Sequence, residues 1–202
     1  MAAVSPRPLG PLPLLPDFPE LNLRTYVEYE GKPGVWFFSL DAASRAIVLG
    51  GRRLYGLPYF HARIRHAWDA GSLRFESVRR GSGIRFEARC QAVGDEFFAS
   101  RGTFEHWATE RYCLYSTLPG GELVRVEVHH APWPLRPARA SVAADALLAA
   151  AGFAPPGDDW ICHCSRGVDV ISFDAEPLTP AASFASADTP HVPAHPPPPA
   201  PA

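Results

Sequence analysis

The feature that most limits how this chain can fold is a series of short segments in which apolar and polar side chains alternate. LNLRTYVEYE at 21–30 alternates in this way, the turn GKPG follows it, and VWFFSL at 35–40 continues the chain. Alternation with a period of two is typical of strands that bury one face. The segments 72–80 and 83–93 alternate again on either side of a Gly-Ser-Gly turn. The sequence therefore predicts two β-hairpins.

The remaining segments predict further strands and a few short helices. ELVRVEVHH at 122–130 and WICHCSRGVDVISF at 160–173 have the composition of strands. Cap and stop residues indicate three helices: one from an N-cap at Asp41 to a stop at Gly50-Gly51, one after Thr103, and one over 141–152. Many hairpins and few helices predict a mainly β (α+β) fold, an antiparallel sandwich or barrel, and argue against a Rossmann type.

The prolines divide the chain into a folded part and two ends. Of the 23 prolines, six lie in residues 6–19 and nine lie from Pro177 onward. We therefore expect a proline-rich leader at 1–16, one folded domain at 17–176, and a disordered proline- and alanine-rich tail at 177–202. A length of 202 residues, of which 47% are hydrophobic, is enough for one domain with a core.

Composition also limits the expected partners and location. The formal net charge is -2, so no overall charge attracts the chain to nucleic acid or to an anionic membrane. Prolines interrupt the first residues too often for the apolar helix of a signal peptide. The most apolar later stretch, LLAAAGFA at 147–154, is far shorter than a membrane span. We expect a cytoplasmic protein that binds neither nucleic acid nor membrane.

The basic residues are almost all arginine. Lys32 is the single lysine among 19 Lys plus Arg, so it is the one side-chain amine that could form a Schiff base. The stretch GRRLYGLPY at 51–59 has the glycines and basic residues of a phosphate-binding loop. It lacks both G-x-x-x-x-G-K and G-x-G-x-x-G, however, and it follows a predicted helix. We interpret its first glycine as part of a helix stop.

Five motifs follow one another along the chain: FPELNLRTYV (18–27), GVWFFSLDA (34–42), GRRLYGLPY (51–59), TERYCLY (109–115) and HAPWPL (130–135). In this order they resemble the YqjF-like family of uncharacterised bacterial proteins. The resemblance extends through GVDVISF and covers about residues 17–174. That family is similar to the acetoacetate decarboxylase-like superfamily. The resemblance therefore implies a closed, cone-like antiparallel β-barrel around a buried cavity.

The chain departs from the pattern of its relatives in two places. Acetoacetate decarboxylases carry a lysine pair directly after the proline of the stretch that resembles GRRLYGLPY, and one of these lysines forms a Schiff base with a β-keto acid. Here these positions are Tyr59 and Phe60, which argues against an amine-dependent decarboxylase. YqjF-like proteins also carry strand-forming sequence ahead of the first motif. We therefore expect either a misassigned start or a barrel that is incomplete at its N-terminus.

Seven residues are candidates for binding a substrate in such a cavity. Arg24 could hold a carboxylate, or it could be a solvated strand arginine. Glu110 and Arg111 could form an acid–base set with Tyr112, or an ion pair that fixes a helix end. His130 could face the cavity or form a hydrogen bond at a strand end. The full set is Arg24, Arg52, Tyr55, Tyr59, Glu110, Arg111 and His130.

The cysteines do not have the spacing of a metal-binding motif. There are four of them, and no C-x-x-C pair occurs: Cys90, Cys113, Cys162 and Cys164. The thiolates of Cys162 and Cys164 could bind zinc together with His129 or His130, but no spacing signature supports such a site. We interpret the cysteines as structural residues and expect no metal and no cofactor.

Two functions are compatible with the sequence. The first is the binding of a small organic acid or carbonyl compound in a barrel cavity. The protein would then be a lysine-independent lyase or hydrolase, or it would bind this ligand without a reaction. The alternative is a non-catalytic structural or interaction protein with a proline-rich, partner-binding tail. A homo-oligomer is open in both cases. A cavity inside the barrel would favour the first function, and a filled interior the second.

Overall fold

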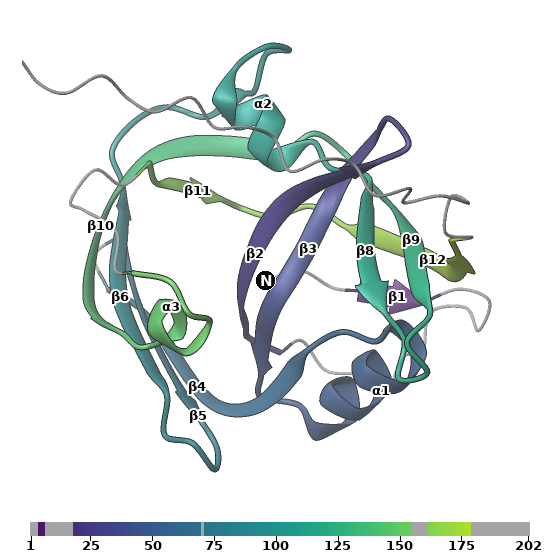
Figure 1. Cartoon of the computed structure of the whole chain (residues 1–202). Helices are drawn as coiled ribbons and strands as arrows, with labels where there is room; N and C mark the ends of the chain where they lie inside the picture. Colours follow the sequence, from purple (N-terminus) through teal and green to yellow (C-terminus); the bar gives the residue numbers. More distant parts are fainter. Residues whose placement is uncertain (1–3, 7–17, 70, 155–160, 179–202) are drawn as a thin grey trace, which may run out of the picture.

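The computed structural model describes residues 4–6, 18–69, 71–154 and 161–178, and Figure 1 shows their arrangement. The strands are β1 (Val4–Pro6), β2 (Glu20–Tyr29), β3 (Lys32–Ala42), β4 (Tyr59–Asp69), β5 (Ser72–Arg79), β6 (Arg85–Ala92), β7 (Phe97–Phe98), β8 (Cys113–Thr117), β9 (Leu123–His130), β10 (Pro134–Asp145), β11 (His163–Ser165) and β12 (Val170–Pro177). The helices are α1 (Arg45–Tyr55), α2 (Phe104–Thr109) and α3 (Leu147–Ala150). A mainly β fold with a few short helices is therefore confirmed.

The predicted hairpins are present, and the chain ends are largely outside the described residues. β2 pairs antiparallel with β3, and β5 pairs antiparallel with β6, as the alternating segments predict. Residues 179–202 of the predicted tail and most of the predicted leader lie outside the described residues. In the described part of the chain, no helix is long and apolar enough to cross a membrane.

The strands form one mixed sheet that does not close into a barrel in the described residues. Their order is β1-β12-β9-β8-β3-β4-β5-β6-β10-β11, with β2 attached to β3 and β7 attached to β10. Three of the pairings are parallel: β1 with β12, β3 with β4, and β3 with β8. The expectation of a closed antiparallel barrel is thus corrected. For β3 and β4 the physical reason lies in α1, which carries the chain from the end of β3 back to the start of β4, and such a crossover makes the two strands parallel.

β3 is the strand at which the sheet divides. One of its edges pairs with β2 from Tyr29 opposite Lys32 to Glu20 opposite Ala42. Its other edge pairs with β8 at Val35 and Trp36 and with β4 at Leu40 to Ala42. β8 and β4 therefore leave the same edge of β3 in different directions, as Figure 1 shows. We call the place where they separate the β3 fork.

The two faces of β3 have different surroundings. Leu40 and Ala42 point to the side of α1 and form a buried cluster with Leu57 and Tyr59. Asp41 lies on the opposite face, because side chains alternate along a strand. We call the face of the sheet that carries Asp41 the inner face and the face that packs against α1 the outer face.

α1 begins and ends later than the sequence predicts. Its N-cap is Ser44, whose Oγ accepts a hydrogen bond from the Ile47 amide over 3.4 Å. The prediction that Asp41 caps the helix was wrong, because pairing with β2 and β4 keeps β3 extended as far as Ala42. Capping by Ser44 satisfies an amide of the first turn that has no partner within the helix.

The helix stop predicted at Gly50-Gly51 was also wrong. Both glycines lie inside α1, and Gly56 ends the helix in the left-handed conformation, with a φ of 61°. A Cβ atom at Gly56 would lie 2.1 Å from the carbonyl oxygen of Thr117, so a side chain has no room there. Glycine thus permits both the left-handed cap and the close approach of α1 to β8.

The predicted helix over 141–152 is mostly a strand. β10 continues to Asp145, and α3 then forms a single turn whose first amides bond to Asp145 Oδ1 over 3.0 and 3.3 Å. β10 pairs with β6 from Ala138 opposite Ala92 to Asp145 opposite Phe86. The alanines of this segment favour a helix locally, but the hydrogen bonds to β6 satisfy the same backbone groups in a strand. The helix predicted after Thr103 is confirmed as α2.

Candidate functional site

The structure places the seven candidate residues in two groups. Figure 1 shows that α2 and α1, around which the groups lie, are on opposite sides of the molecule. The group near α2 is Arg24, Glu110, Arg111 and His130, and the group near α1 is Arg52, Tyr55 and Tyr59.

Two arginines and two aromatic rings form the centre of the α2 group. The rings of Tyr26 and Trp107 are 4.2 Å apart between centroids. The guanidinium carbons of Arg24 and Arg111 each lie 5.6 Å from the Tyr26 centroid, and that of Arg111 lies 5.2 Å from the Trp107 centroid. Such distances are typical of cation–π contacts. We call these four residues the arginine–aromatic site.

β2 and the end of α2 position this site. Arg24 lies opposite Phe37 in the pairing of β2 with β3, and Phe37 packs against the core beneath α1. Arg24 is therefore on the outer face and is exposed. Trp107 lies in α2, which Thr103 caps through a hydrogen bond from the His106 amide.

Neither arginine of the site forms an ion pair with a described residue. Arg24 Nη2 donates to the carbonyl oxygen of Ala108 over 3.4 Å, and Arg111 Nη1 donates to the carbonyl oxygen of Glu110 over 3.3 Å. Arg111 Nε is buried and has no partner among the described residues. Two guanidinium groups with free donors next to aromatic rings are suited to bind an anion.

Glu110 does not form the ion pair with Arg111 that we considered. Its carboxylate accepts hydrogen bonds from the hydroxyls of Tyr112 and Thr109 instead. The bond to Glu110, together with burial and the carboxylate charge, raises the pKa of Tyr112 to about 12. Tyr112 is therefore protonated at neutral pH, and it holds Glu110 beside the arginine–aromatic site.

His130 packs next to the site, against Tyr112 and the Arg111 backbone. It is buried, stacks on Tyr112 at 4.7 Å between centroids and lies 5.6 Å from Trp133. Its Nε2 lies 3.3 Å from the carbonyl oxygen of Arg111, and its Nδ1 lies 2.9 Å from that of Ala131. Of the two alternatives for this histidine, the structure therefore shows hydrogen bonding at the end of a strand.

The α1 group links the helix to the sheet. Arg52 Nε donates to the carbonyl oxygen of Tyr59 over 2.7 Å, and the Tyr59 hydroxyl donates to Glu20 Oε2 over 2.7 Å. Burial raises the pKa of Glu20, and burial together with the Glu20 charge raises that of Tyr59. The Tyr55 carbonyl accepts from the Ser116 hydroxyl. Two of these hydrogen bonds join α1 to β4 and β8, so this group is suited to hold α1 in place.

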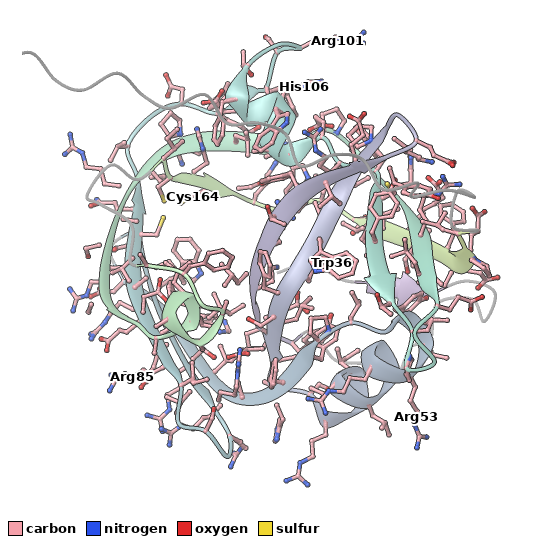
Figure 2. All side chains as sticks on the ribbon, in the orientation of Figure 1. Trp36, Arg53, Arg85, Arg101, His106 and Cys164 are labelled. Atoms are coloured by element: carbon pink, nitrogen blue, oxygen red, sulfur yellow. The ribbon has the colours of Figure 1, made fainter. Side chains whose placement is uncertain are left out.

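A pocket of about 270 Å³ opens at the β3 fork. Figure 2 labels Trp36, which lies between β3 and β8 at this pocket. Its walls carry no charged side chain and contain none of the seven candidate residues; they are Trp36, Phe37, Phe38, Gly56, Leu57, Pro58, Tyr115, Ser116 and Thr117. The pocket is thus suited to an apolar group rather than to an acid.

A buried ion pair on the inner face was not predicted from the sequence. Arg79 Nε and Nη2 lie 2.9 and 2.7 Å from Asp41 Oδ1, and Ser77 Oγ lies 3.4 Å from Asp41 Oδ2. The Arg79 guanidinium carbon also lies 3.7 Å from the ring centroid of Phe60. Phe60 is one of the two positions at which the resemblance places a lysine. The alternation of Ser39 and Asp41 with Leu40 and Ala42 was a sequence signal that both polar side chains lie on one face of a strand, but it did not signal that this face is buried.

Solved structures identify the class of fold. The chain is similar to acetoacetate decarboxylase from Legionella pneumophila, with a TM-score of 0.57 and 14% sequence identity over 81% of this chain and 67% of that one. A second acetoacetate decarboxylase structure has a TM-score of 0.54 and 17% identity over 80% of this chain and 68% of that one. The protein therefore has a fold of the acetoacetate decarboxylase type.

Sequence comparison then identifies the family. The model of the DUF2071 family, described as an uncharacterized conserved protein, matches residues 1–169. The chain belongs to this family. It is 38% identical to the uncharacterized protein YqjF of Bacillus subtilis strain 168 over 164 residues, which are 79% of this chain and 67% of YqjF. The resemblance found in the five motifs is thus confirmed.

Proposed function

We propose that this protein binds a small organic acid or carbonyl compound at the arginine–aromatic site, without a Schiff-base lysine. The observation that carries the proposal is the pair Arg24 and Arg111, which lie on the same tyrosine ring and have backbone carbonyls but no carboxylate as partners among the described residues. A carboxylate ligand would accept hydrogen bonds from their free N–H groups. The ligand would also reduce the repulsion between two like charges.

The neighbouring residues give the site further chemistry. Tyr26 and Trp107 offer ring faces for the carbon skeleton of a small ligand. Glu110 and Tyr112 form a hydrogen-bonded carboxylate and phenol next to Arg111, which suits them to take up or donate a proton. If the protein is an enzyme, these groups support a lyase or hydrolase that acts on a small acid. The acetoacetate decarboxylase fold supports such a ligand class, because those proteins are named for a small keto acid.

The single lysine does not contribute to this site. Lys32 lies at the start of β3 and forms an ion pair with Glu127 of β9. The positions that would carry the lysine pair are Tyr59, which bonds to Glu20, and Phe60, which lies against Arg79. The proposed chemistry therefore uses guanidinium groups in place of an amine.

Binding of small keto and hydroxy acids to the purified chain tests the proposal. Isothermal titration calorimetry with a panel of such acids should identify at least one ligand, with sulfate as the control for nonspecific anion binding. Arg111→Gln and Arg24→Gln should each lower the affinity for that ligand about tenfold to a hundredfold, because each removes a charged hydrogen-bond donor. Arg101→Gln is the matched control, since Arg101 is exposed and projects away from the fold (Figure 2).

Two results would contradict the proposal. One is the absence of binding by every acid of the panel at millimolar concentration. The other is a ligand whose affinity is unchanged in both Arg24→Gln and Arg111→Gln. The alternative function, a partner-binding protein with a proline-rich tail, concerns residues 179–202, which lie outside the described residues, and it stays a prediction.

A further inference from the structure

Three of the four cysteines meet on the inner face of the sheet. The Sγ atom of Cys90 in β6 lies 3.0 Å from that of Cys164 in β11 and 3.6 Å from that of Cys162 just before β11. Figure 2 shows Cys164 where β11 meets β10, with a second sulfur atom beside it. The fourth cysteine, Cys113, is buried in β8 and contacts the carbonyl oxygen of Pro33.

The strand pairing of β10 brings these thiols together from distant parts of the sequence. β10 pairs with β6, and in this pairing Ala140 lies opposite Cys90. β10 also pairs with β11, and there Arg136 lies opposite Cys164. The Ala138 amide also donates to the carbonyl oxygen of Cys162 over 2.9 Å. Cys90 and Cys164 are 74 residues apart in the chain, so the contact depends on the tertiary fold.

The distances between the sulfur atoms favour a disulfide over a metal site. Thiolates that share a tetrahedral zinc ion at about 2.3 Å lie about 3.8 Å from one another. The Cys90–Cys164 contact of 3.0 Å is clearly shorter than that distance, whereas the Cys90–Cys162 contact of 3.6 Å is close to it. The shorter contact is the one that favours a disulfide. Within the described residues, no group of three or more His, Cys, Asp or Glu side chains has the arrangement of a metal site.

We propose that Cys90, Cys162 and Cys164 form an oxidisable thiol site, in which a hydroperoxide converts Cys90 and Cys164 to a disulfide that joins β6 to β11. Cys90 is the shared partner, because it contacts both other thiols. Cys162 is the exchange partner, whose thiolate can displace Cys164 from the disulfide and form the second linkage to Cys90.

The hydroperoxide is the only oxidant that this reaction needs. The thiolate of one cysteine attacks the O–O bond, its sulfur becomes a sulfenic acid, and water or an alcohol leaves. The second thiolate attacks the sulfenic sulfur, so the S–S bond forms, the S–O bond breaks and water leaves. The two sulfur atoms lose two electrons in total, and the peroxide gains them.

The surroundings of the thiols set the pH dependence of this reaction. Burial and the neighbouring thiols raise the pKa of Cys90, and burial raises the pKa of Cys162. These thiols are therefore mostly protonated at neutral pH. The thiolate is the attacking form, and at pH values below the pKa of the attacking thiol its fraction rises about tenfold per pH unit. The rate of oxidation should therefore rise by the same factor.

The disulfide would fasten a short strand that the sheet otherwise holds weakly. β11 has three residues, and it pairs with β10 at Leu135, Arg136 and Pro137. His163, between the two cysteines, also lies 3.7 Å from Glu105 of α2. A covalent bond to β6 thus restrains the segment that contacts the helix of the arginine–aromatic site.

Peptide mapping of the oxidised full-length chain tests the proposal. The reduced protein is treated with stoichiometric hydrogen peroxide at several pH values, digested without reduction, and measured by mass spectrometry. We expect a Cys90–Cys164 crosslink, a fall from four free thiols to two, and a faster reaction at higher pH. The melting temperature of the oxidised protein should be higher by about 5–15 °C.

Cysteine-to-serine variants identify the partners. Cys164→Ser should shift the crosslink to Cys90–Cys162, Cys162→Ser should retain Cys90–Cys164, and Cys90→Ser should abolish both. Cys113→Ser is the matched control and should still form the Cys90–Cys164 crosslink, with its free thiols falling from three to one. If Cys90→Ser does not fold, the double variant Cys162→Ser/Cys164→Ser replaces it and should also form no crosslink.

Three outcomes would overturn the proposal. The first is oxidation that adds oxygen to single cysteines without forming an internal disulfide. The second is a disulfide that involves Cys113 or joins two chains. The third is stoichiometric zinc uptake by the reduced protein that requires Cys90, Cys162 and Cys164, which would establish a metal site instead.

Discussion

Asp41 shows how the surroundings of one side chain decide what it does. It is 1% exposed, and its carboxylate accepts two hydrogen bonds from Arg79 and one from Ser77. Removing two charges from water is costly, and the geometry of the pair offsets that cost. When one partner is replaced, the other remains as a buried charge without compensation. The ion pair therefore favours this arrangement of β3 and β5 over other folded arrangements. It contributes less to the difference in free energy between the folded and the unfolded chain.

At the residue scale we predict that Asp41→Asn lowers the free energy of unfolding by about 3–5 kcal/mol. The substitution keeps the shape of the side chain but leaves the Arg79 guanidinium buried and unpaired. Urea denaturation monitored by circular dichroism measures the change. The control is Glu76→Gln, which breaks a partly exposed contact with Arg85 and should cost about 0–1 kcal/mol. Equal effects of the two substitutions would contradict the prediction.

α1 shows at the element scale why two adjacent glycines are not equivalent. A Cβ atom at Gly50 would meet nothing within 4 Å, whereas a Cβ atom at Gly51 would lie 2.5 Å from the ring of Tyr59. The ring cannot easily move, because Tyr59 is buried and its hydroxyl bonds to Glu20. Gly51 thus allows the helix to approach the core closely, and Gly50 only reduces the stability of the helix.

We predict that Gly50→Ala and Gly51→Ala change stability in opposite directions. Gly50→Ala should raise the free energy of unfolding by about 0.5–1 kcal/mol, because alanine restricts the unfolded chain and favours the helix. Gly51→Ala should lower it by about 1–3 kcal/mol through overpacking against Tyr59. Thermal and urea unfolding of the two variants, each compared with the wild type, measure both effects. A loss of stability in Gly50→Ala would contradict this account of α1.

The whole molecule has a well-buried centre and weakly held edges. The most buried apolar side chains include Val35 and Leu40 of β3, Cys113 of β8, and Val124 and Val126 of β9. β11, by contrast, has three residues, all half-buried or exposed. Local opening requires less free energy where few apolar contacts are lost.

We predict that native-state hydrogen exchange follows this distribution. The amides of β3, β8 and β9 should exchange slowest, at rates that approach global unfolding, and those of β11 and α3 should exchange much faster. Mass spectrometry of deuterated peptides measures these rates. Cys113→Ser serves as a control that should leave the order unchanged. Slowest exchange in β11 of the reduced protein would contradict the prediction.

The sequence by itself determined several of the strands, the family and the absence of a lysine pair. Alternation along 21–30 and 35–40 specified β2 and β3, because a strand with one buried face needs side chains of period two. The motifs identified the family, and Tyr59 and Phe60 excluded a lysine at those positions. These are properties of short segments, which local patterns can specify.

Only the tertiary structure decided which segments meet. Pairing with β6 made a strand of the alanine-rich segment that ends in Asp145, although its local preference is helical. Packing placed Asp41 against Arg79, brought Arg111 to the ring of Tyr26, and brought Cys90 into contact with Cys164. Each of these contacts joins residues far apart in the chain. Its free energy depends on burial and pairing that no short stretch of sequence contains.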